Sequence, residues 1–350
     1  MAHATDDPPS DYADFGLLLN QESQQGFAMP TIASFNLCNF GADASPARLE
    51  QLGTIIAREL EGPDILAVQE VKGESLGPAE RLAPADPAYQ ALIAAIAQAG
   101  GPNYAFREIP PLANQDGGMA RANIRIGLLF NPLRVNFTGR GAAGPEDSTG
   151  IRFNNGKPSL TLNPGRIAPT DPAFAGDDRC HWAPSRKALA AEFEVQGQRL
   201  FVIVCHFKSM RSTTRREADY AKKQRHAQAE IVHHFAADLL ACDPHAAIVL
   251  LGDLNDVPGS KTLKLLKGDS FHNLLEDLPR GQAYTRRHGG QPQALDHILV
   301  SPALRRGASA RIPHINSDAA PGEPDPASDH DPVVATLPGW IAPGGIPQIQ

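Results

Sequence analysis

The chain has 350 residues, of which 42% are hydrophobic and 20% are charged, a balance typical of a folded protein with a large buried core. The formal net charge of −7 argues against a protein that coats nucleic acid indiscriminately, because such binding depends on clustered lysine and arginine. No window approaches about 18 uninterrupted apolar residues, which argues against a membrane-spanning helix.

The N-terminal segment, residues 1–29, is predicted to be a flexible tail because Asp, Pro, Ser and Gln are frequent in it. It has neither a basic start nor an apolar core, so as given it is not a secretory signal. A cytoplasmic location is therefore favoured, with secretion as the alternative if a leader was removed. The cysteines form no CxxC pair and suggest no disulfide framework, which slightly favours a reducing compartment.

Helix start and stop signals recur along the chain. Ser45-Pro46 supplies an N-cap and a proline at the first helical position, and Gly62-Pro63 ends that helix. Asp86-Pro87 repeats the start signal, and Gly100-Gly101 ends the second helix. Residues 138–185 lack periodicity and are expected to form a long surface excursion near a cleft. Two further helices are expected, a long one from near Thr213 to Leu240 and a short one after Ser260.

Several apolar, strand-like runs end in a residue that can bind a metal, a proton or a phosphate. One run covers residues 247–251 and is followed by Gly252 and Asp253. A strand buried on both faces reads as a continuous apolar run, and its polar end emerges at one edge of the sheet. The same pattern yields a set of strand ends: Asn36, Glu70, His206 with Lys208 two positions beyond, Asp253 with Asn255, and Asp296.

Two short motifs carry the chemistry most directly. In the first, Asp253 can orient or deprotonate a water, and the amide of Asn255 can donate hydrogen bonds to a phosphoryl oxygen. The alternative for this motif is an Asx-type turn that caps the strand. The second motif is Ser328-Asp329-His330-Asp331, which sets an imidazole between two acids. Together they favour metal-assisted hydrolysis of a phosphoester.

In their order along the chain, these residues resemble the endonuclease/exonuclease/phosphatase superfamily, which includes the pancreatic-type deoxyribonucleases. The resemblance extends from Thr31 to roughly Leu337. It implies an α/β fold, a four-layer α/β/β/α sandwich with two mixed, mostly antiparallel sheets, formed by one catalytic domain over residues 30–338 and followed by a C-terminal tail over 339–350. The segments most similar to the deoxyribonuclease branch are SFNLCNFG at 34–41, VQEV at 68–71, LLGDLND at 250–256 and SDHDPV at 328–333.

The resemblance also implies a metal site. Glu70 would be the principal ligand of a divalent ion, with support from Asn36 and Asp329. Ligands that are all oxygen atoms favour Mg²⁺, with Mn²⁺ or Ca²⁺ as alternatives, over zinc.

Catalytic roles are implied in the same way. Asp253 would orient or activate the attacking water, and Asn255 would hold the phosphate. His206 and His330, the latter oriented by Asp296, would bind the scissile group, neutralise developing charge and assist the leaving oxygen.

Two basic residues are candidates for phosphate binding. Arg186 matches an arginine that deoxyribonuclease-like relatives place before a strand to contact phosphate, and a bidentate guanidinium suits that role. The alternative is a surface arginine at a strand start. Lys208 opens a basic stretch that continues to Arg225 and follows directly after His206. This stretch is expected either to bind phosphates beside the site or to be a solvated helix face.

One position departs from the family pattern. Ile124 stands where pancreatic-type enzymes carry the glutamate that orients their first catalytic histidine. His206 therefore needs another partner for its ring. His206 also stands where the abasic-site repair branch has tyrosine, which favours the deoxyribonuclease branch.

The sequence thus predicts a divalent-metal-dependent phosphodiester hydrolase, an endonuclease that cleaves DNA with little sequence preference. One alternative is a phosphoesterase that acts on lipid head groups or small phosphorylated molecules with the same fold. Another, from a different class, is a nucleic-acid-binding module without catalysis. No obligate protein partner is evident from the sequence.

Overall fold

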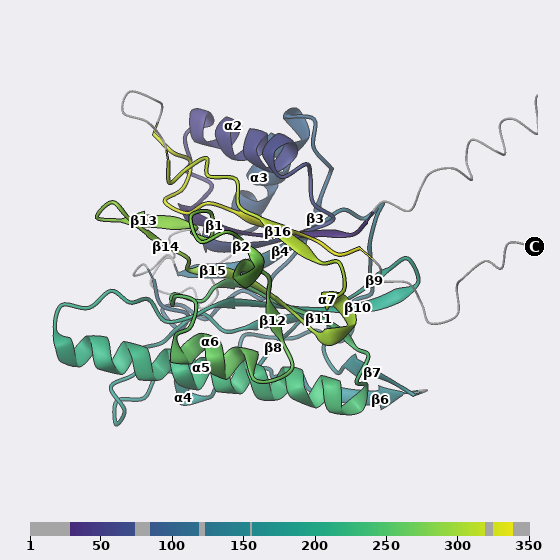
Figure 1. Ribbon diagram of the computed structural model, residues 1–350, viewed down its shortest axis with the longest axis vertical. Coiled ribbons are helices and arrows are strands. Elements are labelled where there is room, and N and C mark those ends of the chain that lie inside the picture. The colour runs from purple at the N-terminus through teal and green to yellow at the C-terminus, as the bar shows by residue number, and fades with distance from the viewer. Residues whose placement is uncertain (1–28, 74–84, 119–122, 155, 319–324, 339–350) are drawn as a thin grey trace, which may run out of the picture.

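The computed structural model describes residues 29–73, 85–118, 123–154, 156–318 and 325–338. Two large β-sheets pack face to face, and helices cover the outer face of each sheet (Figure 1). The predicted four-layer α/β/β/α sandwich is therefore confirmed. Of the two predicted tails, residues 1–28 and 339–350 lie outside the described residues. No helix in the described part of the chain is long and apolar enough to cross a bilayer.

The first sheet has the strand order β16-β17-β1-β2-β4-β3. Its central pair, β1 with β2, is parallel, and every other neighbouring pair on this path is antiparallel. The strands are β1 (Thr31–Phe40), β2 (Ile65–Lys72), β3 (Ala105–Arg107), β4 (Ile124–Phe130), β16 (Ser309–Arg311) and β17 (Val333–Thr336).

The second sheet has the order β12-β15-β11-β10-β9-β5, and β8 also pairs with β9. Here β10 and β11 are parallel, while the other pairs are antiparallel. The strands are β5 (Asn136–Phe137), β8 (Gly165–Arg166), β9 (Leu189–Val195), β10 (Gln198–His206), β11 (Ala247–Asp253), β12 (His272–Asn273) and β15 (Asp296–Val300).

The core explains why the central strands read as continuous apolar runs. Along β10, Val202 and Val204 face the layer between the sheets, whereas Phe201 and Ile203 face the helices. Successive side chains of a strand point to opposite faces, so a strand covered on both faces needs apolar residues at every position. Each fully buried large side chain of this kind contributes about 1.5–3 kcal/mol of stabilisation.

The helices largely follow the predicted signals. Ser45 caps α2 (Pro46–Thr54) by accepting a hydrogen bond from Arg48 N, and the helix continues as a π-helical turn over Ile55–Glu59. Thr214 and Glu217 form a capping box on α5. The other helices are α3 (Asp86–Gln98), α4 (Pro172–Ala175), α5 (Arg215–Cys242), α6 (Lys261–Lys267), α7 (Pro302–Arg305) and a 3₁₀ turn (Leu274–Asp277). In the view of Figure 1, α2 and α3 lie above the first sheet, and α5 and α6 lie below the second.

The expected excursion at 138–185 is more regular than its composition suggested. It forms a hairpin of β6 (Ile151–Asn154) and β7 (Lys157–Leu160), and it adds β8 to the second sheet. Apolar side chains such as Phe174, which is fully buried in the core beside α5, hold it in place. Another hairpin, β13 (Arg286–His288) with β14 (Gln291–Gln293), follows near the active site described below.

The two parallel pairs deliver their carboxyl ends to the same edge of the sandwich. In the first sheet Asn36 is paired with Gln69, and in the second His206 is paired with Asp253. Strand β1 packs against β11 and β15 across the sandwich, so the polar ends of both sheets face one another there.

Candidate active site

Residues far apart in the sequence meet at this edge. The amide Nδ2 of Asn36 donates a hydrogen bond of 3.0 Å to Oδ2 of Asp253, although the two are separated by 217 positions. The Nε2 atom of His206 lies 3.5 Å from Oδ2 of Asp253 and 3.9 Å from Oε1 of Glu70. The ends of β1, β2, β10 and β11 thus form one polar cluster that spans both sheets.

The local backbone at the end of β11 requires glycine. A Cβ on Gly252 would lie 1.9 Å from the carbonyl oxygen of Cys205, and the φ of this glycine is +133°. Beyond it, Asp253 Oδ1 accepts a hydrogen bond of 2.8 Å from Asn255 N, which is the Asx-type turn considered above. Asn255 adopts φ +50°, and its Nδ2 donates to the carbonyl oxygen of Phe207 at 3.1 Å. The turn and the cluster coexist, because the turn is what holds both side chains at the edge.

Burial changes the acidity of Asp253. This carboxyl group is 2% exposed, and loss of hydration together with the nearby Asp296 charge raises its pKa to about 7. A carboxyl group with a pKa near neutrality can accept a proton and release it again, which is the requirement for general base catalysis.

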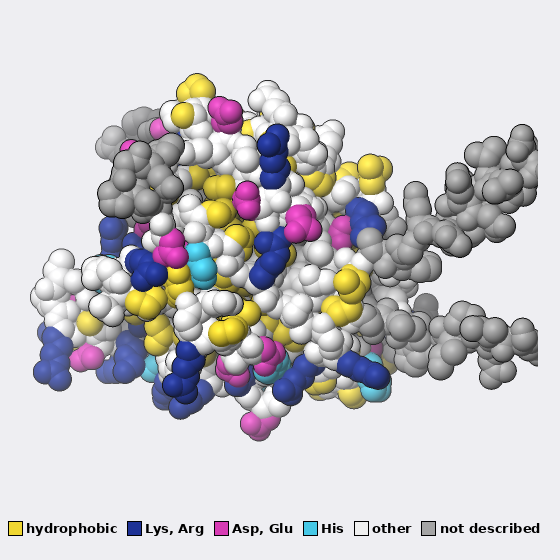
Figure 2. All heavy atoms as spheres, turned by 45° about the horizontal axis from the view of Figure 1, so that its top comes forward, with side chains coloured by type: hydrophobic (Ala, Val, Ile, Leu, Met, Phe, Trp, Pro, Cys, Tyr) yellow, Lys and Arg dark blue, Asp and Glu magenta, His cyan; other side chains and the backbone are white. Residues whose placement is uncertain are grey.

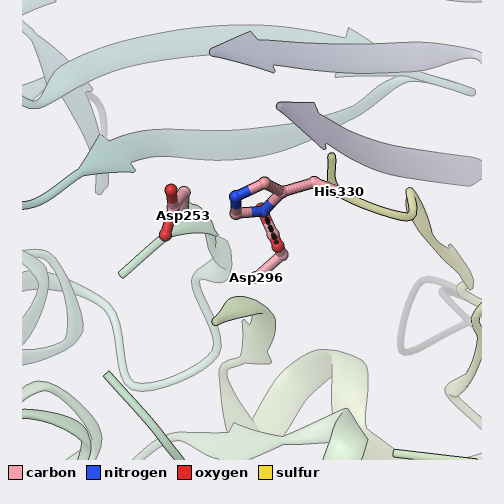
Figure 3. Close-up of side chains that lie close together, drawn as sticks. All are labelled: Asp253, Asp296 and His330. Atoms are coloured by element: carbon pink, nitrogen blue, oxygen red, sulfur yellow. Dashed lines mark hydrogen bonds and ion pairs between the residues drawn. The ribbon is translucent and has the colours of Figure 1, made fainter. Parts of the chain in front are cut away.

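A buried ion pair lies next to Asp253. The Nδ1 atom of His330 donates to Oδ2 of Asp296 at 2.7 Å, and Figure 3 shows the ring directed with its other nitrogen toward Asp253. Thr285 Oγ1 donates to the same Asp296 oxygen, also at 2.7 Å. Burial by itself would lower the pKa of His330, but the charge and hydrogen bond of Asp296, together with the charges of Asp253 and Asp329, outweigh it and raise the pKa to about 10. The imidazole therefore carries its proton at neutral pH.

The segment that carries His330 is tied to the first sheet. Ser328 Oγ donates to the carbonyl oxygen of Asn36 at 2.6 Å and accepts from His330 N at 3.1 Å. Asp331 is fully buried and accepts hydrogen bonds from the backbone N–H groups of Asn316 and Ser317. In the Ser328-to-Asp331 motif, the first and last residues therefore position the loop.

His206 has a different environment. Its ring is 2% exposed, and its Nδ1 atom has no hydrogen-bond partner among the described residues. Burial and the nearby cations Arg186 and His330 hold the pKa of His206 well below its usual range. This agrees with the missing glutamate at Ile124, a buried residue at the start of β4.

Glu70 sits in a strained part of the backbone. It has φ +58°, and the nearby Cys38 and Asn39 of β1 also have positive φ. The register of β1 and of β2 shifts at these positions, so each strand carries an irregularity of the kind that redirects side chains. Oε2 of Glu70 accepts from Asn39 N at 3.1 Å, and the side chain is 20% exposed.

Arg186 and Lys208 lie beside the cluster. Arg186 is buried, its Nη2 donates to the carbonyl oxygen of Phe207 at 2.6 Å, and its Nε has no partner among the described residues. Burial lowers the pKa of Arg186, and the negative charges of Glu70 and Asp253 act against that shift. For Lys208, burial first and then the Arg186 charge lower the pKa.

The basic stretch after His206 divides into two kinds of residue. Arg225 is buried, with its Nε 3.2 Å from Oδ2 of Asp256 and its Nη1 donating to the carbonyl oxygen of Lys208. It therefore holds the segment in place. The exposed cations are Arg211, Arg215, Arg216, Lys222 and Lys223.

A model of the endonuclease/exonuclease/phosphatase family matches residues 33–330. The chain belongs to this family. Comparison with curated protein sequences finds no match. Among solved structures, a truncated TDP2 from Caenorhabditis elegans has 15% identity and a TM-score of 0.53, over 88% of this chain and 96% of that one.

Two other solved structures have the same fold. The human Nocturnin catalytic domain with bound sulfate has 15% identity and a TM-score of 0.51, over 88% of this chain and 93% of that one. D. rerio TDP2 complexed with single-strand DNA product has 17% identity and a TM-score of 0.50, over 88% and 98%. At these identities the likeness concerns the fold, which is that of a family of phosphodiesterases and phosphatases.

Enzymes of the endonuclease/exonuclease/phosphatase family generally depend on a divalent metal. Asp253, Asp296 and His330 bring potential ligand atoms within 4.8 Å of one another. This group suits a cation poorly, because the His330 ring is protonated and its Nδ1 already donates to Asp296. Glu70 fits a hard cation better, since its Oε1 accepts no hydrogen bond from any described residue and faces the cluster.

Asp329 belongs to the same loop as His330 but is held elsewhere. Its Oδ2 lies 2.6 Å from Nη2 of Arg286 on β13, and its side chain is 45% exposed. Arg286 could not be predicted from the sequence, because the hairpin that carries it has no hydrophobic pattern and lies 43 positions before Asp329. Thr285, which supports Asp296, could not be predicted either, because no apolar run or motif marks its position.

Proposed function

We propose that this chain is a divalent-metal-dependent phosphodiester hydrolase that nicks DNA with little sequence preference. The observation that carries the proposal is the buried His330–Asp296 ion pair beside Asp253, whose pKa is raised to about 7. This arrangement supplies a proton acceptor and a protonated imidazole in the same site, the two kinds of group that hydrolysis of a phosphodiester uses.

Asp253 is proposed to orient the attacking water and to take its proton as the new oxygen–phosphorus bond forms. His330, whose charge is maintained by Asp296, neutralises the developing charge and assists the leaving oxygen. His206 and Asn255 bind the non-bridging oxygens of the scissile group. Asn255 reaches it after exchanging its present hydrogen bond to Phe207.

Glu70 and Asn36 are proposed to hold the cation, with Asp329 joining them once it separates from Arg286. We expect Mg²⁺, with Mn²⁺ or Ca²⁺ as alternatives, because the donors are oxygen atoms. When bound, such an ion supplies positive charge that polarises a phosphoryl oxygen.

DNA is the favoured substrate class for two reasons. D. rerio TDP2, which has the same fold, has a crystal structure in complex with a single-strand DNA product. In this chain, Arg186 and Lys208 place positive charge directly beside the proposed catalytic residues, where a phosphate backbone would pass.

A plasmid-nicking assay tests the proposal. Supercoiled plasmid incubated with the purified protein and Mg²⁺ or Mn²⁺ should be converted to the relaxed form. Chelator and the His330→Ala variant should each abolish this conversion. The matched control is His245→Ala, which removes an exposed histidine that precedes β11 at the end opposite Asp253, and it should nick like the wild type.

Plasmid that stays intact with every metal would contradict the nuclease proposal. Release of inorganic phosphate or choline phosphate without nicking would instead assign the same catalytic group to small phosphoesters or lipid head groups.

A further inference from the structure

A cavity of about 450 Å³ opens next to the proposed active site, between the start of α5 and the segment that precedes Arg186. We call it the α5 pocket. The lining residues that matter to its chemistry are His181, Lys208, Arg211, Arg216, Glu217 and Tyr220.

Lys208 joins the α5 pocket to the catalytic residues. It lines the pocket and lies two positions after His206. Its backbone is fixed at both polar groups, since Lys208 N donates to Gln228 Oε1 at 2.8 Å and its carbonyl oxygen accepts from Arg225 Nη1 at 3.2 Å. A strand whose scissile phosphate lies at His206 can therefore reach the pocket past Lys208.

An aromatic surface forms one wall of the α5 pocket. The rings of His181 and Tyr220 lie with centroids 4.8 Å apart and an interplanar angle of 32°. The guanidinium of Arg216 and the ammonium of Lys223 lie 5.5 Å and 5.7 Å from the centroid of the Tyr220 ring. His181 is exposed and Tyr220 is half-buried. Accessible aromatic rings flanked by cations are an arrangement on which unpaired nucleobases stack.

Among the described residues, the cations of the α5 pocket form no ion pair with the pocket's own acid. Glu217 is engaged in the helix cap, where its Oε2 accepts from Thr213 N and Oγ1 at 2.7 Å each. In the described part of the chain, no carboxylate lies within ion-pair distance of Arg211 or Arg216. Figure 2 shows Lys and Arg side chains gathered at its lower left, the side on which α5 begins in Figure 1.

We infer that the α5 pocket binds one unpaired nucleotide of the substrate strand, next to the phosphate that is cleaved. Tyr220 and His181 stack its base, and Arg211 and Arg216 bind its phosphate. Because every base presents a π-face, this contact does not select sequence, but it does select an unstacked strand. The inference rests on the proposed function and adds to it a preference for DNA that is single-stranded beside the cleavage point.

Binding measurements test the pocket separately from cleavage. Fluorescence anisotropy would compare a labelled oligothymidylate of about ten nucleotides with a blunt hairpin duplex, both bound to the protein in a His330→Ala background that keeps DNA intact. Tyr220→Leu should weaken oligothymidylate binding by about tenfold and affect the duplex much less. Tyr220→Phe keeps the ring and should retain most of the affinity.

Charge is tested with a matched pair of variants. Arg216→Gln should reduce the slope of log Kd against log salt concentration by about one, because one phosphate contact is lost. Arg305→Gln removes an exposed charge from α7, beyond the far end of β15, and should leave both affinity and slope as they were. Thermal melting curves would check that each variant is folded.

Equal losses for the single strand and the duplex, or no loss with Tyr220→Leu, would overturn the inference. These outcomes are distinct from failure of the proposed function. If the protein nicks plasmid but Tyr220→Leu binds oligothymidylate normally, only the inference about the pocket is wrong. If Tyr220→Leu weakens oligothymidylate binding but the protein does not nick plasmid, only the nuclease proposal is wrong.

Discussion

The two histidines on either side of Asp253 occupy opposite electrostatic environments. His330 and His206 are both 2% exposed. His330 donates to the Asp296 carboxylate, and its pKa rises to about 10. The Nδ1 atom of His206 has no partner among the described residues, and its pKa is held well below the usual value.

The difference shows that burial alone does not define a catalytic histidine. Loss of hydration acts on both rings in the same direction, toward the neutral form. The surrounding carboxylates, Asp296 first and then Asp253 and Asp329, reverse that direction for His330. The pair therefore divides the work in the proposed mechanism, with His330 as the charged group and His206 as a neutral hydrogen-bonding group.

The largest effect is expected from His330→Gln. This variant removes the charged imidazole but keeps a hydrogen-bond donor of similar reach, so kcat for DNA nicking should fall about a thousandfold. Initial rates on supercoiled plasmid would measure the loss. A decrease of less than about tenfold would show that His330 does not act on the scissile group.

Asp296→Asn should come next, because it removes the charge that keeps His330 protonated. We expect kcat to fall about a hundredfold at neutral pH while the metal concentration for half-maximal activity stays the same. If that concentration rose sharply instead, Asp296 would be acting on the metal site rather than on His330.

The same ion pair predicts a pH dependence of stability. In the unfolded chain a histidine has a pKa near 6.5, and folding raises that of His330 to about 10. The resulting stabilisation is fully present below about pH 6.5 and is lost as the pH rises through about 10. With chelator present, the free energy of unfolding should decline over this range, and Asp296→Asn should flatten the decline. Urea titrations at a series of pH values would measure it, and equal slopes would refute the ion pair.

His206→Asn should have a smaller effect than either change at the ion pair. A neutral ring that contributes one hydrogen bond to the phosphoryl group implies a loss of about tenfold in kcat. The nicking rate should fall at high pH as His330 loses its proton, and the pH at which it falls should be the same in His206→Asn as in the wild type. A shift of that pH in His206→Asn would reverse the assignment of the two rings.

The smallest catalytic effect is expected from Thr285→Val. Thr285 Oγ1 donates to Asp296 and accepts from the backbone N–H groups of Leu295 and Asp296. Valine leaves these buried groups unpaired, which should lower the free energy of unfolding by about 1–3 kcal/mol. Nicking should fall only a few-fold. Chemical denaturation would measure the loss in the free energy of unfolding, and a Thr285→Ser variant should recover most of that loss.

Much of the fold and of the candidate site could be predicted from the sequence because both depend on strands. The apolar run before Asp253 is β11, and the run before His206 is β10. Parallel pairing then places the two residues side by side. The end signals of α2, α3, α5 and α6 were also local, and the structure reproduces these helices with boundary shifts of a few residues.

The remainder depends on contacts that local patterns do not encode. Arg286 pairs with Asp329 from a short polar hairpin, and that contact exists only once both loops are in place. The positive φ values of Cys38, Asn39 and Glu70 are likewise imposed by tertiary structure, since none of these residues favours that conformation to the degree that glycine does. Strands β6 and β7 lie in a segment that was expected to be irregular and instead form a hairpin, because packing of the surrounding segment overrides weak local preference.

The proposed catalytic group is divided between the two sheets. Asn36 and Glu70 lie in the C-terminal halves of two strands of one sheet, and His206 and Asp253 end strands of the other. Sliding one sheet by a single residue, about 3.3 Å, would pull these groups apart. Under the proposed function, the catalytic group would exist only in the fully assembled sandwich, so an incompletely folded or partly unfolded chain would not hydrolyse phosphodiesters.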